Sequence, residues 1–302
     1  LDLFCGCGGL SKGYEMAGYD ILLGVDFNKP ALETYQKNHK GSKALYADLS
    51  DDKAFDEIDN AIKGNRVDVI IGGPPCQGFS LTGRRQFDDS RNKLYLAMIE
   101  AVRRYKPKAF MIENVPGMAT LYNGEVKDEI LKRFSEMGYK MNFKIVCAAD
   151  YGVPQMRRRL VFIGIKDSEQ EYQFPQPYLR PDNYVTCKDA ISDLPSLVDE
   201  LGNEISSYSE EPQTDYQKRM RGDNKLLYNH VAVNHKDFVK ATIAQVPDGG
   251  NYKDLPGGVG ESRKFHVAWT RYCSYKPSGT IDTGHRNHFH YNSTLYINIS
   301  CF

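Results

Sequence analysis

Short apolar segments alternate with amphipathic segments through roughly the first 174 residues, and this alternation limits the possible folds more than any other feature. The apolar segments predict strands over residues 1–4, 21–25, 43–46, 67–71, 108–112, 142–147 and 160–165. The segments between them predict helices near residues 10–17, 29–38, 53–63, 93–105 and 126–137. A repeated strand–helix–strand order is typical of a parallel sheet with helices on both faces. We therefore expect an α/β fold with a doubly wound, mostly parallel sheet.

The alternation stops after Phe174, where Pro175, Pro177 and Pro181 follow in quick succession. The remaining sequence is polar, rich in loop residues and without a clear period, so it predicts a smaller and less regular domain. We place the two domains at residues 1–175 and 176–302.

The charge and the cysteine content of the chain limit which partners it can attract and which cellular compartment suits it. Lys plus Arg and Asp plus Glu both number 39 among the 302 residues, so the whole chain has no net charge to attract nucleic acid or membrane. Seven cysteines in a chain without a long apolar run indicate free thiols in a reducing, intracellular compartment. The chain begins inside a predicted strand without a methionine, so we expect its N-terminal edge to be cut.

The loop after the first predicted strand is rich in glycine. In open parallel sheets, ligands bind beyond the carboxyl ends of the strands, and Gly6 and Gly8 would let the backbone approach a ligand there. The dinucleotide fingerprint is excluded because Ser11 stands where it needs a glycine. Asp26 and Asp48 end the next two strands, where each could cap a helix or lie in solvent. Together with the glycines they favour a nucleoside pocket without a phosphate-binding lysine.

A cysteine follows the fourth predicted strand, in "DVIIGGPPCQGFS" at residues 68–80. Pro74 and Pro75 restrict the backbone, which would hold Cys76 at the end of the strand as a nucleophile, although an ordinary loop cysteine is the alternative. Glu113 follows the fifth strand and would place a carboxylate near this thiol.

A basic triplet opens the last predicted strand. The alternation of a strand puts Arg157 and Arg159 on one side and Arg158 on the other. Such a triplet is usually a solvated surface, but here the two arginines could hold an anion or a base beside the cysteine.

Taken in order, these segments resemble the motifs of the DNA cytosine-5 methyltransferases that use S-adenosylmethionine, of the bacterial restriction-modification type. The matching residues are Phe4, Gly6 and Gly8; Pro74, Pro75 and Cys76; Glu113, Asn114 and Val115; Gln155, Arg157 and Arg159; and "RYCSYKPSGTIDTG" from Arg271. The resemblance covers nearly the whole chain. After "HRNHFHY", however, "NSTLYINISCF" replaces the family's closing Gly-Asn-x-Val segment. We therefore expect weak cofactor binding unless residues 292–302 or a partner supply this wall.

The resemblance implies a covalent mechanism. Cys76 would add to carbon 6 of cytosine, Glu113 would donate a proton at the ring nitrogen, Arg159 would hold the ring carbonyl and Arg157 would help to anchor the site. It also implies that the cofactor S-adenosylmethionine contacts Phe4, Gly6, Gly8, Asp26, Asp48 and Pro74. Because the target carbon lies inside a duplex, the base would be flipped out, with DNA contacts from Gln77, Ser80 and Arg271.

The second domain is expected to recognise the target sequence, and we expect residues 271–291 to pack back against the catalytic domain. Residues 182–215 hold nine acids and one lysine, whereas residues 216–286 hold twelve Lys or Arg and six acids, so the later part favours a DNA-binding face. The polar groups there that could read bases, or that could belong to a linker, are Asn229, His230, Asn234 and His235. His285, His288 and His290 have a spacing that could bind metal, but no cysteine or carboxylate completes the set, so we predict no metal.

The expected partner is double-stranded DNA, with no membrane. A restriction endonuclease could act on the same site without a stable complex, and we expect a monomer in the bacterial cytoplasm near the nucleoid. Two alternatives remain open: an RNA cytosine methyltransferase, which could share this scaffold, and a truncated, cofactor-deficient DNA-binding fragment.

Overall fold

The computed structural model describes residues 1–75, 93–197, 200–232, 234–257, 259, 269–281 and 288–289. The chain divides into two compact units. The first unit comprises Leu1–Val146 and Arg158–Pro175, and the second comprises Cys147–Arg157 and Gln176–Phe302. The segment between the last two strands of the large sheet therefore groups with the second unit.

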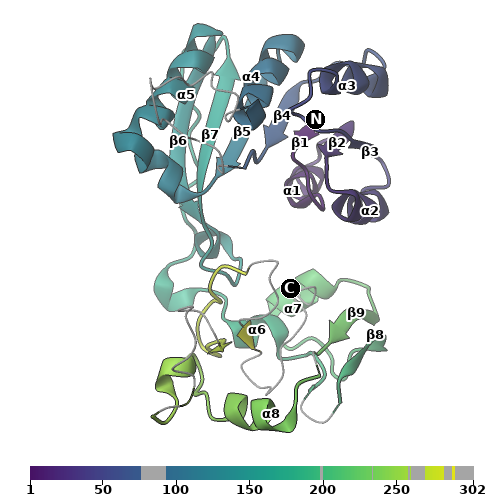
Figure 1. Ribbon diagram of the computed structural model, residues 1–302, viewed down its shortest axis with the longest axis vertical. Helices are drawn as coiled ribbons and strands as arrows, with labels where there is room; N and C mark the ends of the chain where they lie inside the picture. The colour runs from purple at the N-terminus through teal and green to yellow at the C-terminus, as the bar shows by residue number, and fades with distance from the viewer. Residues whose placement is uncertain are drawn as a thin grey trace. The chain divides into compact units, whose positions relative to one another are not determined.

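The first unit contains the predicted series of strands and helices (Figure 1). Its strands are β1 (Asp2–Leu3), β2 (Leu23–Asp26), β3 (Lys43–Tyr46), β4 (Val69–Gly72), β5 (Ala109–Asn114), β6 (Tyr139–Cys147) and β7 (Arg158–Lys166). Its helices are α1 (Gly9–Met16), α2 (Lys29–Asn38), α3 (Ala54–Ile62), α4 (Lys93–Tyr105), the 3₁₀ segment η2 (Pro116–Gly124) and α5 (Glu125–Glu136). The predicted helices at 29–38 and 93–105 and the strand at 43–46 are confirmed at both ends.

The strands form one seven-stranded sheet in the order β3-β2-β1-β4-β5-β7-β6. The pairs β1–β2, β2–β3, β1–β4 and β4–β5 are parallel, whereas β5–β7 is antiparallel. The strand order reverses at the neighbouring central strands β1 and β4. This is the point of an open α/β sheet where loops leave toward opposite faces and ligands bind.

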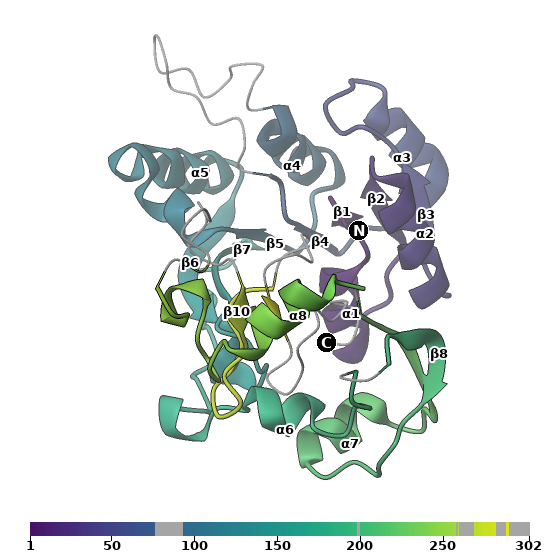
Figure 2. The same cartoon turned by 60° about the horizontal axis from the view of Figure 1, so that its bottom comes forward.

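Helices cover both faces of this sheet. Helices α1 and α2 lie on one face, and α3, α4 and α5 lie on the other (Figure 2). Helix α3 has one apolar face and one polar face, which explains its position on the sheet. The apolar face carries Phe55, Ile58 and Ile62, which recur at helical spacing and are buried. On the polar face, Asp56 and Asp59 pair with Arg104 at the surface. The doubly wound α/β fold predicted from the sequence is confirmed.

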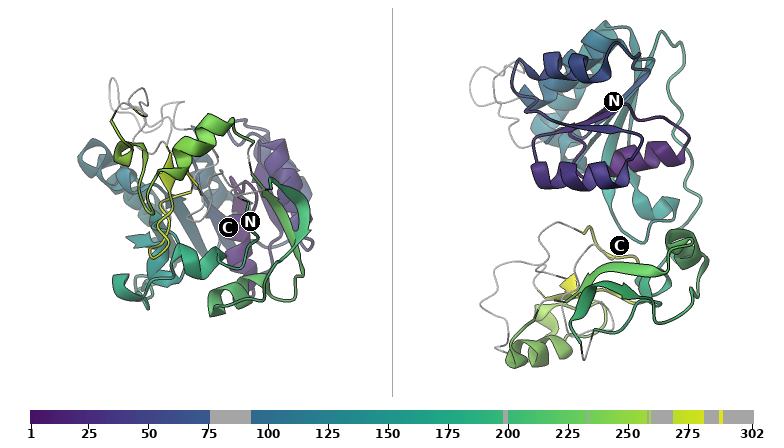
Figure 3. Two further views of the ribbon diagram at one scale, coloured as in Figure 1. Left: turned by 90° about the horizontal axis from the view of Figure 1, so that it is seen from below. Right: turned by 90° about the vertical axis from the view of Figure 1, so that its right-hand side faces the viewer.

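The second unit has shorter elements and a smaller core. They are η3 (Ala148–Tyr151), η4 (Pro181–Asn183), α6 (Cys187–Ile191), β8 (Gly202–Ser207), α7 (Asp215–Arg221), β9 (Leu226–Val231), α8 (Asp237–Ala244), η5 (Tyr252–Asp254), β10 (Thr270–Arg271) and β11 (His288–Phe289). Strands β8 and β9 pair as an antiparallel ribbon (Figure 3). Thr186 and Thr214 cap α6 and α7, and Ile243, Val246, Leu255 and Trp269 form a buried cluster. No helix in the described part of the chain is long and apolar enough to cross a membrane.

Candidate active site

The glycine loop connects β1 to α1 and has an unusual backbone. Phe4, Gly6 and Gly8 have φ angles of 60°, 53° and 93°, in the left-handed region that favours glycine. The amide of Gly6 donates a hydrogen bond of 2.8 Å to Oδ2 of Asp26, which ties the loop to the end of β2. A Cβ atom built on Gly6 would meet nothing within 4 Å, so there is open space beside this residue for a ligand.

The two acids of the predicted nucleoside pocket, one at the end of β2 and one just after β3, have different surroundings. Asp26 ends β2 and is half-buried, with Oδ1 accepting from the amide of Asn28 at 2.9 Å. Asp48 is exposed, and its Oδ1 accepts from both the amide (2.9 Å) and the hydroxyl (2.7 Å) of Ser50. This is the turn geometry that Asp commonly makes with a residue two positions later. Asp26 is therefore joined directly to the glycine loop.

The Gly-Gly-Pro-Pro loop leaves the sheet beside a carboxylate. A Cβ atom on Gly73 would lie 3.4 Å from Oε2 of Glu113, so the backbone after β4 passes directly against this side chain. Asn114 is buried and donates a hydrogen bond of 2.9 Å to the carbonyl of the buried Pro74. Strand β5 thus holds the start of the Gly-Gly-Pro-Pro loop. Cys76, Gln77 and Ser80 lie outside the described residues.

Glu113 forms an ion pair across the antiparallel strands. Its Oε1 lies 2.6 Å from Nε of Arg159, and the two side chains are 26% and 20% exposed. Glu113 stands opposite Val161 in the register, so Arg159 is its diagonal neighbour on the same face. Arg158 is exposed on the other side, as the predicted alternation requires. A carboxyl group and a guanidinium therefore lie together, the carboxyl group beside Gly73, and both are partly exposed to solvent.

Comparisons with known proteins decide the family. The sequence profile of the C-5 cytosine-specific DNA methylases matches residues 1–288. The chain belongs to this family. The methylase is 35% identical to the Type II methyltransferase M.DdeI of Desulfomicrobium norvegicum, across 96% of this chain and 73% of that protein. It is 36% identical to M1.HphI of Haemophilus parahaemolyticus, across 99% and 74%.

A solved structure agrees with the fold of this methylase. A crystal structure titled as that of a prophage-encoded DNA modification methyltransferase (E. coli) superposes with a TM-score of 0.77 at 26% identity, over 98% of this chain and 84% of that one. The family resemblance, the fold and the enzyme class predicted from the sequence are confirmed, and the family's methyl donor is S-adenosylmethionine.

The residues beside the glycine loop fit the nucleoside part of this cofactor. The loop offers open backbone at Gly6, and Asp26 offers a carboxylate at the end of the neighbouring strand. Phe27 is 60% exposed directly after Asp26, where an apolar ring could cover a planar base. Phe27 was not among the predicted site residues, although a large apolar residue directly after the acidic end of a strand was a signal for it.

Arg157 of this methylase groups with the second unit. Its amide donates to the carbonyl of Gln155 at 2.8 Å, and its carbonyl accepts from the amide of Ala148 at 2.9 Å. Ser278 pairs with the same segment through two backbone hydrogen bonds. Its amide donates to the carbonyl of Pro154, and its carbonyl accepts from the amide of Met156. Two family motifs that are more than 120 residues apart in sequence are therefore paired through backbone hydrogen bonds.

Arg271 does not have the exposed position that we predicted for a DNA contact. It is only 8% exposed, and its guanidinium donates to the carbonyls of Val246 (2.7 Å) and Ile243 (2.8 Å), at the C-terminal end of α8. Carbonyls at a helix end need donors, and a cation is favoured there. Its burial and these two hydrogen bonds favour a structural role for Arg271, and the DNA contact stays a prediction.

The predicted base-reading histidine is also turned inward. His230 is 2% exposed, with Nε2 2.8 Å from the carbonyl of Pro195, and burial lowers its pKa. Asn229, its neighbour in β9, is exposed with a φ of 57°. Within the described residues, no group of three or more His, Cys, Asp or Glu is placed to hold a metal ion, and His285 and His290 lie outside them. The five cysteines that the structure describes are free thiols.

Asp2 is a buried carboxylate below the glycine loop. It is 0% exposed, its Oδ2 accepts a hydrogen bond of 2.7 Å from Ser11, and its Oδ1 has no hydrogen-bond partner. Burial raises the pKa of Asp2 to about 6, against the opposing effect of the Ser11 hydrogen bond. Between pH 3.8, the ordinary pKa of an Asp, and about pH 6, the folded protein binds more protons than the unfolded chain. The contribution of Asp2 to the free energy of unfolding therefore decreases as pH rises.

We expect Asp2→Asn to remove this pH dependence while keeping the shape of the side chain. A shift of about two pKa units corresponds to roughly 3 kcal/mol, since each unit is about 1.4 kcal/mol. The free energy of unfolding of the variant, relative to the parent, should therefore rise by up to that amount from pH 4 to pH 7.5. Urea unfolding at both pH values measures this, and an unchanged difference between the two proteins would contradict a raised pKa.

Proposed function

We propose that this methylase transfers the methyl group of S-adenosylmethionine to carbon 5 of cytosine in duplex DNA, with Cys76 as the nucleophile. The observation that supports the residue roles best is the Glu113–Arg159 ion pair, 2.6 Å apart. Glu113 also lies against Gly73, three residues before Cys76. A proton donor and a cation thus flank the start of the loop that carries the thiol.

These residues suit the electronic demands of the reaction. Carbon 5 of cytosine is a poor nucleophile, so attack of the Cys76 thiolate on carbon 6 is needed to convert the ring to an enamine. Glu113 donates a proton to the ring nitrogen as charge develops there, and Arg159 donates hydrogen bonds to the ring carbonyl. S-adenosylmethionine supplies an electrophilic methyl group on a sulfonium. A base then removes the proton from carbon 5, the ring nitrogen returns its proton to Glu113, and Cys76 leaves as a thiolate while the ring recovers its double bond.

Glu113 and Arg159 bind each other directly. When a cytosine enters, its ring carbonyl competes with Glu113 for Arg159, and its ring nitrogen competes with Arg159 for Glu113. Arg159 is planar and has several donors, so it can contact the ring carbonyl and Glu113 together. We assign Arg157 a supporting role in anchoring the base or a phosphate.

Cofactor contacts come from Phe4, Gly6, Gly8, Asp26, Asp48 and Pro74 in this proposal. The strongest support is the hydrogen bond from the Gly6 amide to Asp26, which holds the loop beside a carboxylate that can accept from ribose hydroxyls. Asp48 would bind the adenine amine. Residues 1–175 supply these groups and form the catalytic domain.

Residues 176–302 form the target-recognition domain in this proposal, with the base flipped past Gln77 and Ser80. The excess of Lys and Arg over residues 216–286 supports a DNA face there. Arg271 is buried, and Arg221 lies over the ring of Tyr208 and beside Asp193, so the phosphate contacts fall to other cations of this segment. We further propose a monomer that acts near the nucleoid, with a restriction endonuclease acting separately on the same sequence.

Tritiated methyl transfer tests the function directly. We expect label from the cofactor to enter plasmid DNA, and bisulfite mapping to place the modified cytosines in one recurring sequence. A parallel reaction with tRNA is the control. Label in tRNA without label in plasmid would identify an RNA cytosine methyltransferase instead, and no label in either would contradict the proposed activity.

A further inference from the structure

We propose that Tyr35 of α2 and His39, directly after this helix, are positioning residues that hold the glycine loop in its cofactor-binding conformation. The inference rests on the proposed function of that loop. Neither residue was identified by its sequence pattern, and both are buried: Tyr35 is 0% exposed and His39 2%. They support the loop from the side of α2.

Gly8 lies directly against both rings. A Cβ atom built on Gly8 would be 2.1 Å from Nε2 of His39 and 2.8 Å from Cδ2 of Tyr35, so no larger residue fits above them. Gly24 in β2 packs against the same tyrosine, because its Cβ would lie 2.4 Å from Cζ of Tyr35. The two rings have centroids 4.4 Å apart and stack at 31°. Tyr35 therefore fills the space between a glycine of the loop and a glycine of the sheet.

A chain of hydroxyl hydrogen bonds fixes Tyr35 in this position. Its hydroxyl lies 3.2 Å from the hydroxyl of Ser11 and 2.9 Å from that of Ser42, and Ser11 in turn donates to Asp2 at 2.7 Å. Ser11 belongs to α1 and Asp2 to β1, so the chain joins the two elements on either side of the loop to α2. The tyrosine hydroxyl connects the two halves of this chain.

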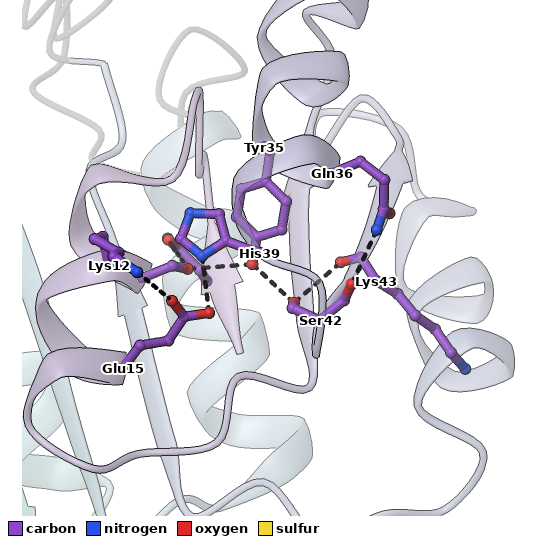
Figure 4. A network of polar contacts seen from close by, with 9 residues as sticks. Lys12, Glu15, Tyr35, Gln36, His39, Ser42 and Lys43 are labelled. Atoms are coloured by element: carbon purple, nitrogen blue, oxygen red, sulfur yellow. Dashed lines mark hydrogen bonds and ion pairs between the residues drawn. The ribbon is translucent and has the colours of Figure 1, made fainter. Parts of the chain in front are cut away.

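A second connection fixes His39. Its Nδ1 lies 2.8 Å from Oε1 of Glu15, and Nζ of Lys12 lies 3.4 Å from the other oxygen of that carboxylate (Figure 4). Glu15 and Lys12 both belong to α1, whose first turn begins directly after Gly8. The histidine ring is thus held from α1 while its other nitrogen faces the loop.

The contacts from Tyr35 and His39 matter because the backbone of the glycine loop has an unfavourable conformation. Phe4 has a positive φ, which a residue other than glycine rarely adopts, and such a conformation persists only where surrounding contacts maintain it. If the support loosens, a smaller fraction of molecules has the binding conformation. The apparent dissociation constant then rises by the same factor, while the chemical step at saturating cofactor does not change.

Tyr35→Phe tests this by removing the hydroxyl while leaving the ring against Gly8 and Gly24. We expect the dissociation constant for S-adenosylhomocysteine, measured by isothermal titration, to rise roughly threefold to tenfold, up to about 1.4 kcal/mol. KM for the cofactor should rise similarly, with kcat and KM for DNA unchanged. Hydrogen exchange of the amides at residues 5–9 should become faster.

Tyr139→Phe is the matched control, because Tyr139 is also buried and its hydroxyl donates to the carbonyl of Pro107 at 2.8 Å, away from the glycine loop. It should lose similar stability without a change in cofactor affinity. Ser42→Ala, a smaller change at the far end of the chain, should weaken binding in the same direction as Tyr35→Phe. Equal dissociation constants for Tyr35→Phe and Tyr139→Phe would overturn the inference. A parent protein that binds no S-adenosylhomocysteine would overturn the cofactor assignment and the inference with it.

Discussion

Cys76→Ser should abolish methyl transfer to DNA while leaving cofactor binding nearly unchanged. Serine has almost the same size as cysteine, but its hydroxyl is far less acidic than a thiol and does not supply a thiolate-like nucleophile at neutral pH. Without the covalent bond to carbon 6, carbon 5 is not activated. We expect less than roughly 10⁻³ of the parental turnover, in line with the loss of other enzymatic nucleophiles.

Two measurements separate this effect from unfolding. Titration with S-adenosylhomocysteine should give the same affinity for Cys76→Ser and the parent, because the glycine loop and Asp26 are unchanged. Cys147→Ser, which alters a half-buried thiol at the end of β6, is the control and should keep its activity. Methylation by Cys76→Ser at near the parental rate would show that another group is the nucleophile.

Glu113→Gln should slow single-turnover methylation by about 10²- to 10⁴-fold, the usual contribution of a general acid. The amide keeps the shape of the side chain and can still accept a hydrogen bond from Arg159. It has no acidic proton to give to the ring nitrogen, so the enamine forms without protonation there. Cofactor affinity should change little, because Glu113 lies against Gly73 and not in the glycine loop.

Glu129→Gln provides a matched control for this variant. Glu129 pairs with Nε of Arg133 at 2.8 Å and is 31% exposed, which is close to the geometry of the Glu113–Arg159 pair. Glu129→Gln therefore removes a comparable ion pair on α5, outside the proposed site. If both variants slow methylation by less than about threefold, Glu113 is not the acid.

Much of the first unit could be predicted because its signals are local. Helix α2 starts at an Asn28 cap with Pro30 in its first turn, and these features mark its start in the sequence. The end of β2 at Asp26 and the end of β5 at Asn114 follow apolar segments, so the positions of Asp26 and Glu113 at one edge of the sheet were also predictable. The antiparallel β5–β7 pair was not, because strand direction depends on tertiary structure.

The features that the sequence did not indicate involve contacts between distant residues. Arg271 looked like a surface cation in an irregular segment, but the carbonyls that it satisfies lie 25 and 28 residues earlier, at the end of α8. Tyr35 resembled an ordinary core aromatic, since nothing local shows that Gly8 and Gly24 leave room for its ring. Sequence periodicity reports which face of a helix is buried, but it does not report which loop that face touches.

The direction of β7 determines which end of that strand can take part in catalysis. In a wholly parallel sheet, residues at the start of a strand lie at the edge opposite the ligand, and Arg159 would be separated from Glu113 by the length of β7, roughly 23 Å for seven residue steps. Because β7 runs opposite to β5, its first residues reach the same edge as the last residues of β5. Arg159 thus stands at the start of its strand and Glu113 near the end of its own. A single reversed strand therefore places Arg159 beside Glu113, at an edge of the sheet that a uniformly parallel β7 would reach only with its last residues.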